Sequence, residues 1–222
     1  MGTEVKNGKS VRVHTVYKTK EGGKVPGVTT VLGILGKPAL IHWAWNLGIE
    51  GIDYRKYRDD KADIGTLAHA MVMAHLKGEE TDTSGYTENQ INLAETCFLK
   101  YLEWEEEHDI VPIMLETPLV SEKYRYGGTL DNYCLLDGIP TLLDYKTGKA
   151  IYDEYFYQLG GYRELLKEHK SPVKRCMILR LGRDETEGFE VKERTDLKLE
   201  IKIFLQCVKV YHLQNELKNK YK

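Results

Sequence analysis

Two aspartates and a lysine are spaced so that one hairpin would bring them together. Asp137-Gly138 separates two mostly apolar runs, and this dipeptide is typical of a two-residue type I′ turn, in which both residues need positive φ. With this turn as the loop, Asp131 lies directly opposite Asp144 on the neighbouring strand, with the two Cβ atoms about 4.5–5.5 Å apart. Lys146 follows Asp144 by two residues and therefore shares that face of the sheet.

Two opposed carboxylates destabilise a hairpin unless a cation neutralises them. Lys146 supplies one positive charge at the end of a long side chain. A divalent ion is the other candidate, because Mg²⁺ is bound by carboxylates, waters and substrate phosphates. From these three residues alone, a metal site and a surface charge cluster both remain open.

The length and composition are those of an ordinary soluble globular domain. The chain has 222 residues, of which 41% are hydrophobic and 30% charged, and its net charge is -2. This size allows one domain with a sizeable core, and the charge neither supports nor excludes a nucleic-acid partner. The sequence shows no membrane-length apolar run and no apolar stretch of a signal peptide. We therefore expect no membrane partner and a cytoplasmic location, bacterial or, for a phage-encoded protein, in the host.

Hydrophobic periodicity and capping residues predict the order of the elements. Asp63 and Asp153 are expected to cap the helices that follow them, and Thr87 with Gln90 fits a capping box. The order implies a mixed sheet flanked by helices, an α/β architecture. We expect strands at residues 11–17, 113–120, 173–181 and 189–192, the hairpin at 125–146, and helices at 28–35, 39–48, 64–77, 88–108, 153–169 and 197–220.

Two stretches near the N-terminus are rich in aromatic residues. Trp43 and Trp45 lie in the helix expected at residues 39–48, where core or interface packing is the expected role. Residues 54–61 mix basic side chains with tyrosines. Such a segment could contact phosphates and bases or form a solvated helix face, and the sequence leaves both open.

Four motifs, in order along the chain, resemble those of one nuclease superfamily. Gly128-Thr129-Leu130-Asp131, followed by Leu143-Asp144-Tyr145-Lys146-Thr147-Gly148, resembles the PD-(D/E)xK signature, with Leu130 in the place of the proline. Gln158-Leu-Gly-Gly-Tyr162 is similar to the Q-x-x-x-Y motif of the RecB-like exonuclease branch, and Gly65-Thr66-Leu67-Ala68-His69 to its G-x-x-x-H motif. The motifs span residues 65–162 and leave the first 60 residues and the C-terminal helix uncovered.

The resemblance implies a single nuclease domain with a restriction-endonuclease-like core. The core would occupy residues 61–182, with a mixed central sheet flanked by helices. Residues 1–60 would form an N-terminal helical and strand addition, and residues 183–222 a C-terminal hairpin and helix.

The resemblance also implies roles for the residues of the hairpin. In the family the two acidic residues, here Asp131 and Asp144, bind one or two Mg²⁺ or Mn²⁺ ions. The backbone carbonyl of Tyr145 and the imidazole of His69 would be further ligands. Lys146 would orient or deprotonate the attacking water and stabilise the developing charge. A divalent ion suits phosphodiester hydrolysis because it acidifies water and binds phosphate oxygen.

Three more residues belong to the candidate site. Gln158 and Tyr162 are four residues apart and so lie on one helical face. The resemblance makes them DNA-positioning or site-supporting residues, and the alternative is packing alone, with Tyr162 at the helix–sheet interface and Gln158 at its rim. Glu116 lies on the strand before the hairpin, where relatives often carry an acidic residue, and its role stays open.

The cysteines exclude two other kinds of site. Cys97, Cys134, Cys176 and Cys207 are far apart and form no CxxC pair, so we expect reduced, mostly buried thiols and neither a zinc ribbon nor a disulfide framework. Some RecB-like nucleases hold an iron–sulfur cluster through one upstream and three closely spaced C-terminal cysteines. Because this spacing is missing, no cluster is expected.

The leading hypothesis is a metal-dependent exonuclease that acts on single- or double-stranded DNA ends in recombination, repair or phage DNA metabolism. The second hypothesis is a structure-specific endonuclease of the same fold. A third is a nucleic-acid-binding module that has lost activity, and a fourth is a metal-dependent enzyme for a small phosphoester. The intact Asp131, Asp144 and Lys146 argue against the inactive module.

Overall fold

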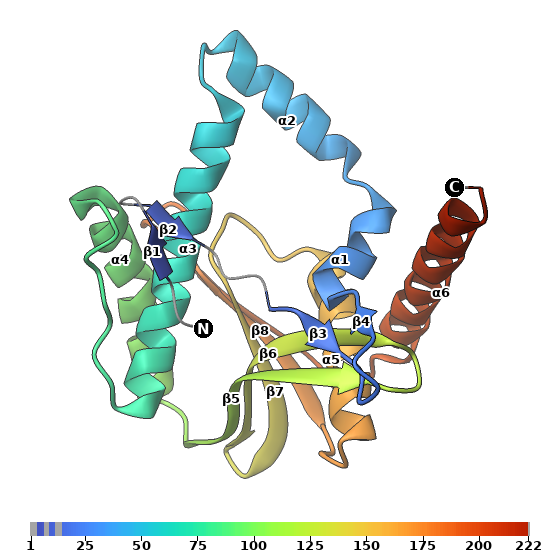
Figure 1. Ribbon diagram of the computed structural model, residues 1–222. Coiled ribbons are helices and arrows are strands. Elements are labelled where there is room, and N and C mark those ends of the chain that lie inside the picture. Colours follow the sequence, from blue (N-terminus) through green and yellow to red (C-terminus); the bar gives the residue numbers. More distant parts are fainter. Residues whose placement is uncertain (1–3, 7–8, 12–14, 222) are drawn as a thin grey trace.

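The computed structural model describes residues 4–6, 9–11 and 15–221 (Figure 1). Its centre is a five-stranded sheet of order β5-β6-β7-β8-β9, in which β7 and β8 run parallel and the other neighbours antiparallel. The expected mixed sheet flanked by helices is therefore confirmed. The sheet strands are β5 (Ile110–Ser121), β6 (Tyr126–Leu136), β7 (Ile139–Lys146), β8 (Arg175–Leu181) and β9 (Phe189–Arg194).

Helices and two short hairpins complete the chain. The helical additions expected at both ends are present, as α1 and α2 at one end and α6 at the other. The helices are α1 (Val28–Leu32), η1 (Gly33–Leu35), α2 (Pro38–Ile49), α3 (Tyr54–Lys77), α4 (Glu88–Glu105), α5 (Asp153–Glu168) and α6 (Lys198–Lys220), and the short strands are β1 (Glu4–Lys6), β2 (Lys9–Val11), β3 (Tyr17–Lys18) and β4 (Lys24–Val25).

The β6–β7 hairpin has the predicted turn and register. Asp137 and Gly138 have φ values of 54° and 74°, as a type I′ turn requires. Pairing runs from the turn to Asn132 opposite Leu143. Beyond that pair β7 continues beside β8 as far as Lys146. Asp131 and Asp144 therefore stand at the first position past the paired part of the hairpin.

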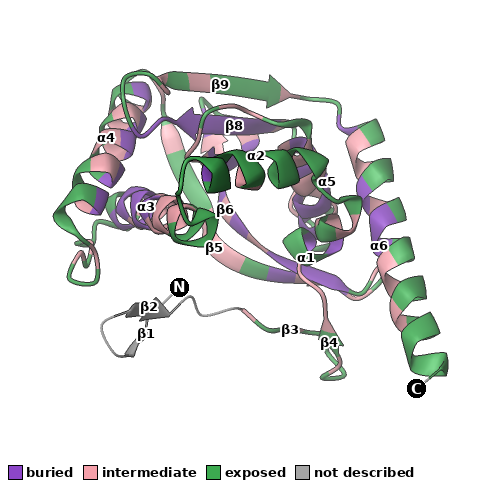
Figure 2. Cartoon of the chain, turned by 90° about the horizontal axis from the view of Figure 1, so that it is seen from above, coloured by how far each residue is buried: buried purple, intermediate pink, exposed green. Residues whose placement is uncertain are grey.

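Helices cover both faces of the sheet and bury two separate hydrophobic clusters. α3 and α4 pack on one face, where the strands contribute residues such as Cys134 and Leu143. α1, α5 and α6 pack on the other face, against residues such as Tyr133 and Leu142. Because both faces are covered, β7 reads as a nearly continuous apolar run. Figure 2 shows buried positions in β6, β8, α3 and α5, while α2 is mostly exposed and has Leu47 as its buried residue.

Two predicted helix starts are wrong. α3 begins at Tyr54, and its cap is Asp53, whose side chain accepts a hydrogen bond from the Arg55 N–H at 2.9 Å. Asp63 lies inside this helix, which also runs without a break through the expected boundary at residue 61. α5 is preceded by Tyr152 without a side-chain cap, and Asp153 is its first helical residue. An acidic residue in the first turn still interacts favourably with the helix dipole.

Other local predictions have mixed outcomes. Both hydrogen bonds of the capping box between Thr87 and Gln90 are present, and all four cysteines are free and buried. The strand expected at 11–17 falls partly on residues 12–14, outside the described residues. Trp45 is 60% exposed, so of its two expected roles core packing is wrong and interface packing stays a prediction. No helix within the described ranges is both long and apolar enough to cross a bilayer.

Candidate active site

The two aspartates of the hairpin meet where β6 and β7 part. Asp131 accepts a hydrogen bond from the Tyr145 N–H at 3.0 Å, so its carboxylate takes the place of a strand partner for that amide. Asp144 is only 1% exposed, and its Oδ2 forms an ion pair with the Lys146 ammonium. The structure thus brings Asp131, Asp144 and Lys146 together, as the register predicts.

Burial controls the charges of this pair. Burial, helped by the charge of Asp131, raises the pKa of Asp144 to about 6, although the nearby Lys146 ammonium acts to lower it. Burial on its own would lower the pKa of Lys146, but the carboxylates of Asp144 and Asp131 outweigh it and the pKa is raised. Lys146 is therefore a cation at neutral pH. In this arrangement it can neutralise charge or donate a proton.

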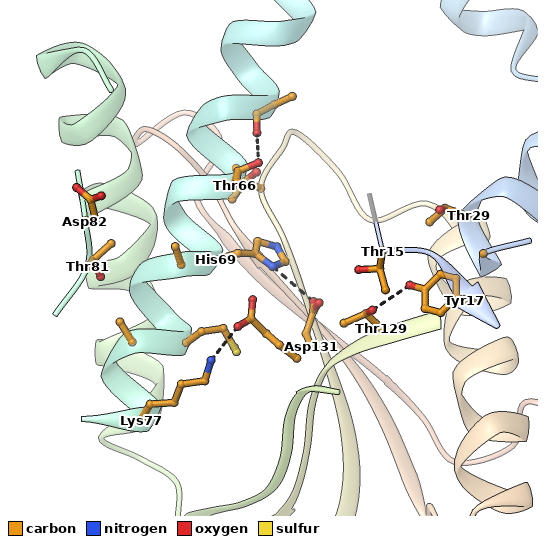
Figure 3. A pocket seen from close by; sticks show the side chains of 18 of the residues that line it. Thr15, Tyr17, Thr29, Thr66, His69, Lys77, Thr81, Asp82, Thr129 and Asp131 are labelled. Carbon is orange, nitrogen blue, oxygen red and sulfur yellow. Dashed lines mark hydrogen bonds and ion pairs between the residues drawn. The ribbon is translucent and has the colours of Figure 1, made fainter. Parts of the chain in front are cut away.

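His69 reaches the same point from α3. Its Nδ1 lies 3.7 Å from Asp131 Oδ2, and its ring stands edge-on to the Tyr145 ring, with centroids 6.0 Å apart. Figure 3 shows the imidazole pointing from α3 toward Asp131 on the sheet. Gly65, one turn earlier, allows this approach because a Cβ there would lie 2.6 Å from Thr147 Oγ1.

A cleft of about 1200 Å³ opens over these residues. Asp131, His69 and Glu116 line it, together with several threonines and the N-terminal segment around Tyr17. The Tyr17 and Thr129 hydroxyls are hydrogen-bonded at 2.9 Å across one side (Figure 3). The remaining lining is mixed in charge, with Lys24, Lys61, Lys77 and Arg183 beside Glu79, Glu80 and Asp82.

Gln158 and Tyr162 support the site from α5. The Gln158 amide donates to the Tyr162 hydroxyl at 2.9 Å and toward Asp144 Oδ1 at 3.4 Å. Tyr162 is 5% exposed, and its ring lies so close to Gly128 that a Cβ there would be 2.6 Å from Cε1. Both the ring and the hydroxyl of Tyr162 are engaged inside the protein, which favours site support and helix–sheet packing over direct positioning of DNA.

Glu116 stands beside Asp131 in an unusual backbone conformation. Its neighbours Leu115 and Thr117 pair with Asn132 and Leu130, so Glu116 occupies the position opposite Asp131. Its φ is 43°, in the left-handed region that non-glycine residues rarely adopt. Its carboxylate is 2.8 Å from the Lys77 ammonium. The side chain faces the cleft, and its chemical role stays a prediction.

Two residues next to the site were not predicted from the sequence. The Tyr155 ring lies under the Lys146 ammonium, with Nζ 5.1 Å from the centroid. Tyr155 is three residues before Gln158, so the shared helix face was the available signal. Asn132, buried behind the hairpin, donates to the Tyr145 hydroxyl at 3.0 Å, while its own Oδ1 is buried without a partner. No sequence pattern distinguishes that asparagine.

The donor types suit a hard divalent ion, although a ligand cluster is not assembled. Carboxylates with an imidazole are appropriate for Mg²⁺ or Mn²⁺, and the buried Asp144 Oδ2 is paired with the Lys146 ammonium. Yet the described residues contain no group of three or more His, Cys, Asp or Glu side chains arranged to hold a metal. The cation beside Asp144 is Lys146. Metal binding therefore requires adjustment of side chains, and the Tyr145 carbonyl remains a predicted ligand.

The sequence matches no protein-family model and no curated protein. Two solved structures with similar folds are exonucleases by description. A proposed exonuclease from Eubacterium rectale is 12% identical, with a TM-score of 0.47, over 68% of this chain and 65% of that protein's length. LHK-Exo, an alkaline exonuclease from Laribacter hongkongensis, is 11% identical in its complex with dAMP, with a TM-score of 0.43, over 73% of this chain and 88% of LHK-Exo. Because these similarities are low, function is inferred from the side chains of the site.

Proposed function

We propose that this chain is a divalent-metal-dependent deoxyribonuclease that removes nucleotides from DNA ends. The observation that carries the proposal is the meeting of Asp131, Asp144 and Lys146 at the parting of β6 and β7, with His69 across from them. A buried carboxylate with a raised pKa beside a second carboxylate is typical of a functional site.

The chain's own residues would perform distinct parts of the hydrolysis. Asp131, Asp144, His69 and the Tyr145 carbonyl would hold one or two Mg²⁺ or Mn²⁺ ions, which when bound supply an acidified water and neutralise phosphate charge. The Lys146 Nζ would stabilise the charge that develops on the phosphate oxygens as water adds to phosphorus and the ester bond breaks.

The size of the cleft favours a polymeric substrate over a small phosphoester. Its volume of about 1200 Å³ exceeds the roughly 300–1,000 Å³ of most small-ligand pockets. The half-buried side chains of His69 and Asp131 line its wall, so a strand lying in the cleft would pass them. This supports DNA hydrolysis in recombination, repair or phage DNA metabolism. An endonuclease of the same fold would use the same residues.

Digestion of labelled DNA tests the proposal. End-labelled single- and double-stranded linear DNA and closed circles are incubated with Mg²⁺, Mn²⁺ or EDTA. We expect mononucleotides from linear DNA, intact circles, no product in EDTA, and no product with Asp144→Asn. Asp82→Asn is the matched control, since Asp82 is a carboxylate on the cleft wall away from the site (Figure 3).

Three contrary outcomes would each point to a different conclusion. Nicked circles would show an endonuclease, and DNA binding without cleavage in any metal would show a binding module. Full activity of Asp144→Asn would remove this residue from the chemistry and refute the site.

A further inference from the structure

A ridge of α3 continues from the active site toward the start of the helix. Tyr57, Lys61, Gly65 and His69 are spaced four residues apart, so each is adjacent to the next along a ridge that winds slowly around the helix. Lys61, Gly65 and His69 all line the cleft. The Lys61 ammonium also lies over the Tyr57 ring, 5.5 Å from its centroid. Tyr57 therefore extends the cleft wall by one turn.

Three aromatic rings meet at this end of α3. Trp43 of α2 packs against Tyr54 and Tyr57, with centroid distances of 6.5 Å and 6.1 Å. The rings lie outside the two hydrophobic clusters that the structure defines, and Tyr54 is 39% exposed. Figure 1 shows why: α2 and the first turns of α3 project beyond the sheet, where little else packs on them. These rings form the aromatic corner, defined by Trp43, Tyr54 and Tyr57.

Positive charge surrounds the aromatic corner. Arg55 lies 5.9 Å from the Tyr54 centroid, Lys61 covers Tyr57, and Lys56 is exposed. Both acidic residues among residues 54–61 already have partners, one within this stretch and one on α4. Asp59 is paired with Arg58 at 2.7 Å, and Asp60 accepts a hydrogen bond from Gln90 of α4 at 2.9 Å. Rings interleaved with cations bind single-stranded nucleic acid, because the rings stack on bases and the cations meet phosphates.

We propose that the aromatic corner and Lys61 bind the single-stranded part of the DNA substrate beyond the cleavage site. This inference rests on the nuclease function proposed above. Twelve residues separate Tyr57 from His69, which at 1.5 Å per residue is about 18 Å along α3. That length corresponds to about five nucleotides at the 3.4 Å spacing of one strand in a B-form helix.

Single-stranded DNA fits this surface better than a duplex or a protein. A duplex keeps its base faces stacked inside, so it offers nothing for an aromatic ring to stack on. A protein partner would use Trp and Tyr as well, but the aromatic corner is continuous with the cleft through Lys61. A protein partner would gain nothing from that continuity.

Equilibrium binding of DNA in EDTA tests the aromatic corner and Lys61 without any need for cleavage. Fluorescent single-stranded oligonucleotides of about 12 and about 4 nucleotides, respectively longer and shorter than the roughly five-nucleotide span, are compared with a blunt duplex by anisotropy. Tyr57→Leu should weaken binding of the longer strand about fivefold or more, as loss of one stacked base predicts. Tyr54→Leu, at an exposed position, repeats the test where folding is least at risk. Lys61→Gln should lower the slope of log affinity against log salt by about 0.7.

A matched control comes from the next tryptophan of α2. Trp45 is 60% exposed and stacks on His42, away from the aromatic corner, so Trp45→Leu should bind all three DNAs like the parent. Equal binding of long and short strands, or parental binding by both tyrosine variants, would overturn the proposal. A loss with Trp45→Leu equal to that with Tyr57→Leu would also overturn it.

Failure of the nuclease function is visible separately. Hydrolysis of bis(p-nitrophenyl) phosphate with Mn²⁺, compared between the parent and Asp144→Asn, reports on the active site and needs no DNA contacts. If the parent hydrolyses neither this ester nor DNA, the proposed nuclease function is refuted, while the binding experiment still tests whether the aromatic corner and Lys61 bind DNA. If the parent cleaves DNA and both tyrosine variants bind DNA as tightly as the parent, only the proposal for the aromatic corner is refuted.

Discussion

Substitution of Gly65 tests the contact between α3 and Thr147, the residue that directly follows β7. A Cβ at this position would lie 2.6 Å from Thr147 Oγ1, and its next neighbour, Thr147 Cβ, would be at 3.9 Å. Overpacking of this kind costs about 1–3 kcal/mol, while replacing a helical glycine with alanine returns up to about 1 kcal/mol. We expect Gly65→Ala to lower the free energy of unfolding by about 0–2 kcal/mol.

The double variant with Thr147→Ala isolates this contact. Removing the hydroxyl leaves Thr147 Cβ as the nearest atom, at an ordinary contact distance. Gly65→Ala should then be neutral or stabilising, and the cycle should give a coupling free energy of about 1–3 kcal/mol. Urea unfolding of the four proteins measures it. A coupling below about 0.5 kcal/mol, the usual scatter between independent sites, would refute the close approach of α3 to this loop.

DNA cleavage by the same four proteins connects the contact to function. His69 is one turn from Gly65, so a displaced helix moves the imidazole away from Asp131. We expect Gly65→Ala to lose more activity than the double variant. Gly48→Ala is the control, since it is also in a helix but has no atom within 4 Å of the added Cβ. It should keep full activity and unfold at the parental urea concentration or slightly above it.

Four further predictions concern the charges and the support of the site. Lys146→Ala should reduce the single-turnover rate at saturating DNA by about 10²- to 10⁴-fold; an unchanged rate with weaker DNA binding would make Lys146 only a phosphate anchor. The pKa of Asp144, raised from 3.8 to about 6, means that its protonated form is favoured by folding, so this group's stabilisation is present below pH 3.8 and lost as pH rises through 6. Asp144→Asn should remove this loss of about 3 kcal/mol, and a difference between parent and variant that is equal at about pH 4 and about pH 7 in EDTA would contradict the raised pKa of the buried Asp144 carboxyl. Tyr162→Phe should lower the free energy of unfolding by about 1 kcal/mol, as for the loss of one hydrogen bond. Tyr162→Ala should lower it by about 3–5 kcal/mol because the ring is buried. If both variants lowered the melting temperature by the same amount, the ring would contribute little packing. Gln158→Ala should slow DNA cleavage, while calorimetry with Mn²⁺ should show that the variant still binds the metal.

The hairpin was predictable because its information is local. A two-residue turn at Asp137-Gly138 fixes the register, and the register places Asp131 opposite Asp144 without knowledge of the rest of the fold. His69 comes from a distant helix, so its approach to Asp131 followed only from the family resemblance. Local spacing says nothing about which face of α3 meets the sheet.

Tertiary packing explains both the wrong helix start at Asp63 and the buried position of Tyr162. Asp63 has the chemistry of a helix cap, but α3 continues through it because Asp53 caps the chain earlier and α4 packs along the helix. Tyr162 has the ring that could stack on a base, but Gly128 leaves a space that this ring fills. That space is created by a residue without a side chain, on another element, and no periodicity of α5 predicts it.

One rigid helix connects the two sites proposed here. α3 carries Tyr57 and Lys61 of the proposed DNA-binding surface and also His69. A helix fixes the distance between these residues along its axis at about 1.5 Å per residue. A strand held at Tyr57 would therefore reach the proposed metal ligands at a nearly constant length, whatever its sequence, because stacking and phosphate contacts tolerate any base. Such a helix favours stepwise removal of nucleotides from an end over recognition of an internal sequence. The buried side chains of α3 hold this helix to the sheet, and the close approach of Gly65 to Thr147 sets its position at the end of β7.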